Sequence, residues 1–195
     1  MSKFEHRAPD GACPQLQETR IEGETVYQGN FLQVERDLVR LPDGKTASRE
    51  FIRHPGAVVI LPLFDDGSVL LERQFRYPIH QAVLEFPAGK IEPGETPLAC
   101  AQRELQEETG YAAQDWQYVC RVHNALGYSD EFLEIFLARG LTAGKSRPDD
   151  EEFIETFTAS VDALLEWVRR GDVTDVKTVI GAFWLEKIRA GNWKL

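Results

Sequence analysis

Residues 89–111 read GKIEPGETPLACAQRELQEETGY, and the interpretation of the whole chain depends on this stretch. Its second half predicts a helix with Thr96 as the N-cap residue, Pro97 at the first helical position and Gly110 as the stop. The predicted apolar face of this helix is formed by residues at positions i, i+3 and i+7, namely Leu98, Ala101 and Leu105.

Three glutamates, Glu104, Glu107 and Glu108, share another face of this helix because they stand at i, i+3 and i+4. Such a cluster is either a solvated acidic face, partly relieved by an Arg103–Glu107 pair, or a site for a hard divalent cation, which prefers oxygen ligands. The Gly- and Pro-rich loop at residues 89–95 leads into the helix, and its backbone can approach a ligand closely. This loop favours the cation site.

The spacing of these residues resembles the motif of the Nudix hydrolases. Seven fixed Gly, Glu and Arg positions match, which by chance is on the order of one in a million. Tyr111 stands where the motif prefers an aliphatic residue. The resemblance implies an α/β (α+β) fold with a mixed β-sheet sandwiched between helices, and metal-dependent hydrolysis of a nucleoside diphosphate linked to another group. The matching residues are Gly89, Glu95, Arg103, Glu104, Leu105, Glu107, Glu108 and Gly110.

The resemblance also implies roles for individual residues. Glu104 and Glu108 are expected to be the main ligands of Mg²⁺ or Mn²⁺, with Glu107 as a further ligand that also takes part in catalysis. Ala88 is expected to bind the metal through its carbonyl oxygen. Glu95 and Arg103 are expected to shape the loop and the helix.

Within the family the chain most resembles the ADP-ribose pyrophosphatases. The likeness covers most of residues 25–190 and includes HPGAV at 54–58, ERQFR at 72–76 and EFPAG at 85–89. Arg76, Glu85 and Arg53 are the expected substrate-binding residues. Arginine suits a diphosphate because it donates two parallel hydrogen bonds, although Arg76 could instead be a surface arginine beside a strand end.

An acidic run at residues 149–155 falls where related enzymes carry the catalytic glutamate on a loop. Glu152 is the first candidate for the general base and Glu151 the second, since a carboxylate beside a metal-bound water can take its proton. The alternative is a solvated loop without a catalytic role.

The substrate is less constrained than the chemistry. The resemblance favours hydrolysis of ADP-ribose to AMP and ribose 5-phosphate, but Leu126 stands where ADP-ribose-specific members usually carry proline. Another sugar nucleotide, such as GDP-mannose, therefore stays open. A non-catalytic sensor that binds ADP-ribose is a third possibility, and the intact Glu104, Glu107 and Glu108 argue against it.

The chain is predicted to consist of an N-terminal β appendage at residues 1–54 and a catalytic domain at residues 55–195. In the enzymes it resembles, the appendage exchanges between two subunits and helps hold adenine, which implies a homodimer. Tyr27 or Phe31 would then stack on the base, but strand aromatics are more often part of a core.

Alternation of apolar residues and turn signals predict the remaining elements. Residues 25–53 read as an antiparallel β segment with a strand near 31–36 and a turn at 42–44. Residues 57–64 and 68–75 read as a central hairpin. Further strands are expected at 83–86, 116–123, 132–138 and 153–158, and helices at 161–170 and 175–189.

The formal net charge of the 195 residues is −10, which argues against a nucleic-acid partner. Most of this excess lies in residues 85–108 (net −4) and 149–155 (net −5). Three cysteines without CxxC spacing, a polar N-terminus and the lack of a long apolar run predict a cytoplasmic protein that does not bind membranes.

Overall fold

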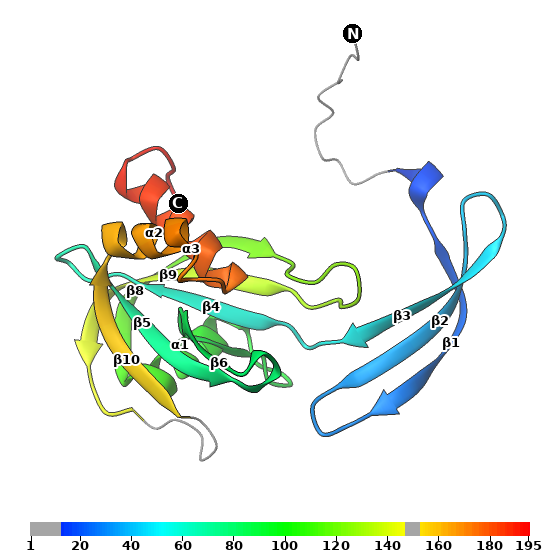
Figure 1. The fold of residues 1–195 in the computed structure, drawn as a ribbon, viewed down its shortest axis with the longest axis horizontal. Coiled ribbons are helices and arrows are strands. Elements are labelled where there is room, and N and C mark those ends of the chain that lie inside the picture. Colours follow the sequence, from blue (N-terminus) through cyan, green and yellow to red (C-terminus); the bar gives the residue numbers. More distant parts are fainter. Residues whose placement is uncertain (1–12, 147–152) are drawn as a thin grey trace, which may run out of the picture. The chain divides into compact units, whose positions relative to one another are not determined.

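The computed structural model describes residues 13–146 and 153–195, which form two compact units (Figure 1). The first unit contains the described residues up to Arg53 together with Gly127–Ser129, and the second contains the rest. Ile52 links the short segment to the first unit, because its N–H donates to the carbonyl of Tyr128 at 2.8 Å and it forms a β-bridge with Ser129.

The N-terminal unit is a three-stranded antiparallel sheet in the order β1-β2-β3, as the sequence predicted. A short 3₁₀-helix, Pro14–Leu16, precedes β1 (Thr19–Gln28), β2 (Gln33–Arg40) and β3 (Thr46–Arg53). The strand expected at 31–36 starts two residues later, because Phe31 and Leu32 belong to the connection between β1 and β2.

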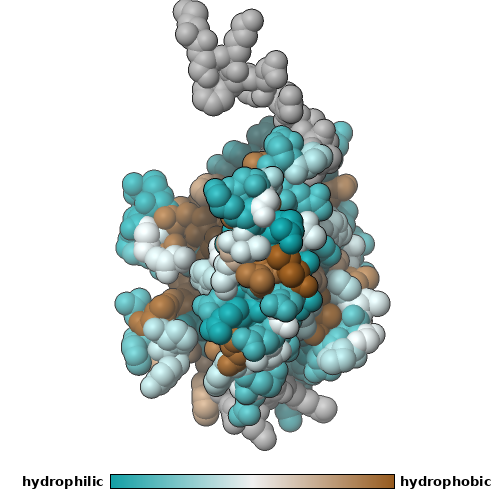
Figure 2. All heavy atoms as spheres, turned by 90° about the vertical axis from the view of Figure 1, so that its right-hand side faces the viewer, coloured by the Kyte–Doolittle hydropathy of each residue, from teal (hydrophilic) through white to brown (hydrophobic). Residues whose placement is uncertain are grey.

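This sheet leaves many apolar side chains exposed. Every residue of β1 is exposed, including Ile21, Val26 and Tyr27. In β2 the side chains of Asp37 and Val39 are buried. Figure 2 shows a face of the molecule on which apolar side chains lie in patches among polar ones. A single sheet cannot bury both of its faces by itself, so this unit has apolar surface left for other contacts.

The second unit contains two sheets. The larger is mixed, in the order β7-β4-β9-β8, with β4 (Ala57–Pro62) parallel to β9 (Leu133–Ala143) and antiparallel to β7 (Ala88–Lys90); β8 (Tyr111–Val122) is antiparallel to β9. The smaller sheet is antiparallel, in the order β10-β5-β6, and consists of β5 (Ser68–Arg76), β6 (Gln81–Glu85) and β10 (Ile154–Ser160).

The predicted central hairpin is wrong in one respect. The chain does reverse after β4, with a bridge between Leu63 and Val69, but β4 and β5 then enter different sheets. The pairing of β4 with the distant β9 is not visible in local sequence, because parallel partners are joined only through a long crossover.

Three helices cover the mixed sheet: α1 (Pro97–Thr109), α2 (Val161–Arg170) and α3 (Val176–Arg189). Alternate residues of β4 divide the core, because Val58 and Ile60 pack with α1, whereas Val59 and Leu61 pack with α2 and α3. The predicted mixed sheet between helices is thus confirmed (Figure 1). No helix of the described ranges is both long and apolar enough to cross a membrane.

The three helices form where the capping signals place them. Thr96, Ser160 and Asp175 are the N-caps of α1, α2 and α3, and each side chain accepts a backbone N–H of the first turn. The apolar face of α1 differs in part from the prediction. Leu98 is 40% exposed, and Cys100 is buried in its place.

Candidate active site

The approach to α1 is a tight loop that ends in a defined cap. Gly94 has φ +84°, which favours glycine, and the N–H of Glu95 donates to the carbonyl of Glu92 at 3.0 Å. The Thr96 hydroxyl then accepts the N–H of Ala99 at 3.2 Å. These contacts fix where α1 begins.

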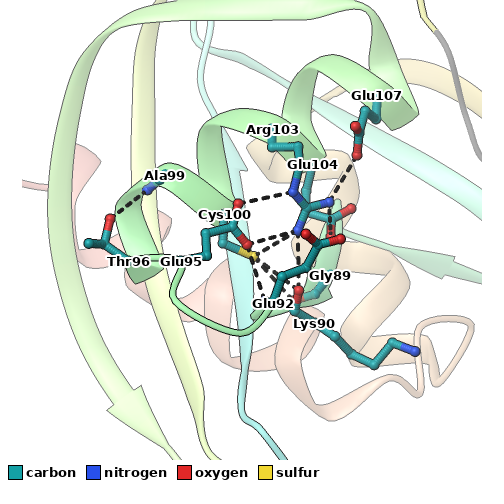
Figure 3. A network of polar contacts seen from close by, with 10 residues as sticks. All are labelled: Gly89, Lys90, Glu92, Glu95, Thr96, Ala99, Cys100, Arg103, Glu104 and Glu107. Carbon is teal, nitrogen blue, oxygen red and sulfur yellow. Dashed lines mark hydrogen bonds and ion pairs between the residues drawn. The ribbon is translucent and has the colours of Figure 1, made fainter. Parts of the chain in front are cut away.

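Arg103 lies at the centre of the acidic face of α1 (Figure 3). Its guanidinium is bidentate to Glu95, with both distances 3.0 Å, and its Nη1 contacts Glu104 at 2.8 Å and Glu107 at 2.9 Å. A further bond of 3.2 Å runs to the carbonyl of Lys90. The predicted Arg103–Glu107 pair is confirmed, and Glu104 and Glu107 lie close together because they share one nitrogen. We call Arg103, Glu95, Glu104 and Glu107 the α1 carboxylate cluster.

The charges of this cluster shift the pKa values of its members. The hydrogen bonds from Arg103 lower the pKa of Glu95 from 4.5 to about 2. Burial, together with the charges of Glu95 and Glu104, raises the pKa of Cys100 to about 12. The Cys100 thiol is therefore protonated at neutral pH and is a packing group rather than a nucleophile.

Two carboxylates of α1 reach the backbone of β7. The Glu104 carboxylate lies against Gly89, where a Cβ would come within 1.9 Å of the Glu104 Cδ, so a larger residue at position 89 would require this carboxylate to move. Glu108 is buried, and its Oε2 accepts the N–H of Ala88 at 3.2 Å. The structure thus brings Glu104 and Glu108 to the segment that contains Ala88, whose carbonyl is another of the four predicted ligands.

This donor set is made of oxygen atoms, which are the ligands that Mg²⁺ and Mn²⁺ prefer. In the part of the chain that is described, no group of three or more His, Cys, Asp or Glu side chains is arranged as a ready metal site. Arg103 instead holds Glu104 and Glu107. The residues fit a hard cation by chemistry and position, and their roles as ligands stay predictions.

A second group of charges surrounds Glu85 at the end of β6. Arg76, at the end of β5, is bidentate to the Glu85 carboxylate, with Nε at 2.6 Å and Nη2 at 2.7 Å. Lys177 of α3 contacts the same carboxylate and also lies 3.0 Å from Asp175. The Glu85 side chain is 2% exposed and the Arg76 side chain 42%. We call Arg76, Glu85, Asp175 and Lys177 the Glu85 cluster.

Burial alone raises the pKa of Glu85, but the hydrogen bonds and charges of Arg76 and Lys177 outweigh it and leave that pKa below the ordinary value. Glu85 is therefore ionised at neutral pH. The exposed side of Arg76 borders a cavity of about 270 Å³, which is lined by Arg76, Ile79, Val83, Glu85, Thr174, Asp175 and Lys177.

The first turn of α3 forms hydrogen bonds with the segment between Glu85 and Ala88, which joins the two clusters. Asp175 Oδ2 accepts the N–H of Thr178 at 3.0 Å and its hydroxyl at 2.6 Å, and the Thr178 oxygen accepts the N–H of Phe86 at 2.9 Å. Phe86 lies between Glu85 and the Ala88 segment, and both Phe86 and Thr178 are fully buried. Hydrogen bonds thus link the start of α3 to Phe86, two residues before Ala88.

Other predicted site residues have simpler surroundings. Arg53 ends β3 in the N-terminal unit, where its Cζ lies 4.8 Å from the centre of the Phe51 ring. Tyr27 and Phe31 are each 56% exposed, so neither is part of a core in this structure. Leu126 is 77% exposed. Glu151 and Glu152 lie outside the described residues, and the roles predicted for all these residues stay predictions.

Sequence reasoning missed Lys177 and Thr178. A lysine in the first turn of a helix is normally solvated, and Lys177 is buried because it pairs with Glu85, 92 residues earlier in the chain, as well as with the nearby Asp175. The sequence offers only a weak signal for this site. After the N-cap Asp175, the first turn of the helix carries Lys177, although an acidic residue would interact better with the helix dipole there.

Two domain families match the sequence. Residues 53–179 match the NUDIX domain, and residues 18–52 match the nucleoside diphosphate sugar hydrolase N-terminal domain. The chain is 36% identical to the ADP-ribose pyrophosphatase of Bacillus subtilis over 88% of its length and 94% of that protein. It is 33% identical to the methanol dehydrogenase activator of Bacillus methanolicus, with the same coverage of both chains.

A solved structure described as an ADP compounds hydrolase has the same fold. It superposes with a TM-score of 0.81, covers 92% of this chain and 98% of its own, and is 24% identical in sequence. At that identity the likeness concerns the arrangement of strands and helices.

Proposed function

The chain belongs to the Nudix hydrolase family, and from this premise we propose that it cleaves the pyrophosphate bond of ADP-ribose to give AMP and ribose 5-phosphate. The matched N-terminal domain is that of nucleoside diphosphate sugar hydrolases, and together with the NUDIX domain it supports the broader activity, hydrolysis of a nucleoside diphosphate sugar. ADP-ribose is the narrower choice, supported by the relative from Bacillus subtilis.

One observation carries the proposal. The Glu104 carboxylate lies against Gly89, and the Glu108 carboxylate accepts the N–H of Ala88. The segment that contains these two residues begins at Glu85, whose carboxylate pairs with Arg76. The carboxylates proposed to hold the cation and the arginine proposed to bind phosphate thus contact the two ends of one short connection, residues 85–89. A bound diphosphate would use both, because a divalent cation would offset its negative charge and an arginine donates hydrogen bonds to phosphate oxygens.

The protein groups divide the work. Glu104, Glu108 and the Ala88 carbonyl would hold Mg²⁺ or Mn²⁺, with Glu107 as a further ligand close to the reacting water. When bound, the metal offsets charge on the diphosphate and lowers the pKa of a bound water. Arg76 orients the diphosphate through the side of its guanidinium that does not contact Glu85. Glu152, or else Glu151, accepts the proton of the attacking water.

The N-terminal unit gives the proposal its second part. Its sheet exposes apolar side chains that a partner could cover, and we assign residues 1–54 to dimerisation and contact with the base, and residues 55–195 to catalysis. Arg53 and either Tyr27 or Phe31 would then contact the nucleoside. Size-exclusion chromatography with light scattering should give twice the mass of one chain. The mass of a single chain would refute the proposed dimer without bearing on the proposed hydrolysis.

The substrate is tested by a panel of ADP-ribose, GDP-mannose, UDP-glucose, NADH and diadenosine polyphosphates in the presence of Mg²⁺. We expect the highest kcat/KM for ADP-ribose, with AMP and ribose 5-phosphate as products. A higher kcat/KM for another sugar nucleotide would change the proposed substrate but keep the proposed chemistry. Leu126, which stands where ADP-ribose-specific members usually carry proline, would agree with that result. If no compound is cleaved, the enzyme proposal fails and a binding protein becomes the better account.

A further inference from the structure

Arg76 can bind a diphosphate only while its guanidinium is held in a productive direction. Its Nε and Nη2 are both used by Glu85, at 2.6 and 2.7 Å, and the Nη1 side lies outside that contact. Because the side chain is 42% exposed, solvent does little to restrict it. Its orientation therefore depends on how firmly the Glu85 carboxylate itself is fixed.

Lys177 is the group that fixes this carboxylate from the protein interior. Its ammonium contacts Glu85 Oε2, the same oxygen that accepts Arg76 Nη2. The Lys177 side chain is 11% exposed, and its second partner, Asp175, is held by two bonds from Thr178. A buried ion pair of this kind has little freedom, because moving either partner would leave the other charge unpaired in a low dielectric.

We propose that Lys177 is a positioning residue that orients Arg76 for the diphosphate through their shared carboxylate Glu85. The order of contacts is Asp175, Lys177, Glu85 and then Arg76, so the start of α3 determines how the end of β5 presents its arginine. This inference rests on the proposed hydrolysis of a nucleoside diphosphate sugar. It assigns a role to a residue of α3, whereas the helical residues of the family motif lie on α1.

Lys177 does not bind the substrate itself in this arrangement. Two of its three ammonium donors already face carboxylates, and its side chain is about four times less exposed than that of Arg76. Its loss should therefore weaken substrate binding by releasing Arg76, with less effect on the chemical step at the α1 carboxylates.

The test measures kcat and KM for the substrate that the wild type cleaves, ADP-ribose first, in Lys177→Met, Arg76→Gln and the double variant. We expect Lys177→Met to raise KM about tenfold with kcat within about threefold of the wild type. In the Arg76→Gln background the same change should raise KM less than about twofold, because the residue it positions is absent. Lys177→Arg keeps the cation and should return KM to within about threefold of the wild type.

Two variants separate positioning from a general loosening of α3. Thr178→Val removes the two hydrogen bonds of the Thr178 hydroxyl, with Asp175 and with the N–H of Phe86, but leaves the Glu85 cation pair, so it should raise KM less than about threefold. Lys187→Met removes a partly exposed lysine of the same helix, paired with its neighbour Glu186, and should leave both constants unchanged. If Lys177→Met does not fold, as judged by thermal unfolding, Lys177→Gln takes its place under the same criteria.

Three results would overturn the inference. The KM increases of Lys177→Met and Arg76→Gln could multiply in the double variant, or Lys177→Met could lower kcat without changing KM. The third is that Thr178→Val raises KM as much as Lys177→Met does. In each of these the wild type still cleaves its substrate, so the proposed function survives. A wild type that cleaves no nucleoside diphosphate sugar would instead remove the proposed function, and the inference with it.

Discussion

The α1 carboxylate cluster and the Glu85 cluster differ in net charge. In the first, one guanidinium serves Glu95, Glu104 and Glu107, so the ion-paired groups carry a net charge of −2. In the second, Arg76 and Lys177 balance Glu85 and Asp175. Under the proposed function the first cluster would be completed by added cations, whereas the second is already neutral and can serve as a rigid support.

Burial differs most between the carboxylates at the two extremes. The Glu107 side chain of the first cluster is 40% exposed, whereas the Glu85 side chain of the second is 2% exposed. The other carboxylates of the two clusters are similar, with Glu95 and Glu104 at 15% and 13% and Asp175 at 18%. Unbalanced charge is tolerated near water, where repulsion is screened, and buried charge is tolerated only when it is paired. The comparison predicts that changes in the first region affect activity most and that changes in the second affect stability most.

The largest effect on activity is expected from Glu108→Gln. The amide can still accept the N–H of Ala88, so the fold should keep its stability, but the negative charge that would hold the metal is lost. We expect kcat to fall by orders of magnitude and the melting temperature to change by only a few degrees. Glu92→Gln, an exposed acid in the preceding loop, is the matched control. Near-normal turnover in Glu108→Gln would remove this residue from the site.

The largest effect on stability is expected from Glu85→Gln. This change leaves Arg76 and Lys177 beside an uncharged amide, and breaking a buried ion pair costs about 3 kcal/mol or more. Urea unfolding should show this loss. Glu166→Gln breaks an exposed pair with Arg169 and should lower the free energy of unfolding far less. Equal losses in both variants would contradict the distinction between the regions.

The pH dependence of stability should report on Glu95. Its pKa is about 2 when folded and has an ordinary value of 4.5, so its stabilising contribution is present above pH 4.5 and is lost as the pH falls toward 2. Thermal unfolding of the wild type in this range should show a steeper decline than that of Glu95→Gln. Parallel curves for the two proteins would mean that Arg103 does not stabilise the Glu95 carboxylate.

The smallest effect is expected from Glu107→Gln without metal. One of three carboxylates around Arg103 is then neutral, so relief of repulsion and loss of the exposed pair nearly cancel. The free energy of unfolding in EDTA should stay within about 0.5 kcal/mol of the wild type. A loss above 1 kcal/mol would show that the cluster is a structural support like the Glu85 cluster.

The sequence predicted the features that depend on local chemistry. Thr96, Pro97 and Gly110 delimit α1 because capping and stop signals act within one turn, and the spacing of Glu104, Glu107 and Glu108 is a property of any helix. The pairing of Arg103 with Glu107 is confirmed for the same reason.

Features that depend on distant parts of the chain were not predicted. The parallel pairing of β4 with β9 and the short strand β7 require partners far away in sequence. The burial of Lys177 arises only when α3 meets β6. Leu98 was assigned to the core from periodicity alone, whereas the position of the sheet buries Cys100 instead.

The central claim is that the carboxylates of α1 hold a divalent cation that drives hydrolysis of a sugar nucleotide. Its most direct test is the rate of AMP release from ADP-ribose by the purified protein with Mg²⁺, after excess EDTA, and after Mg²⁺ is restored. We expect hydrolysis to be lost on chelation and to return with the metal. Hydrolysis that continues in excess EDTA would contradict the account.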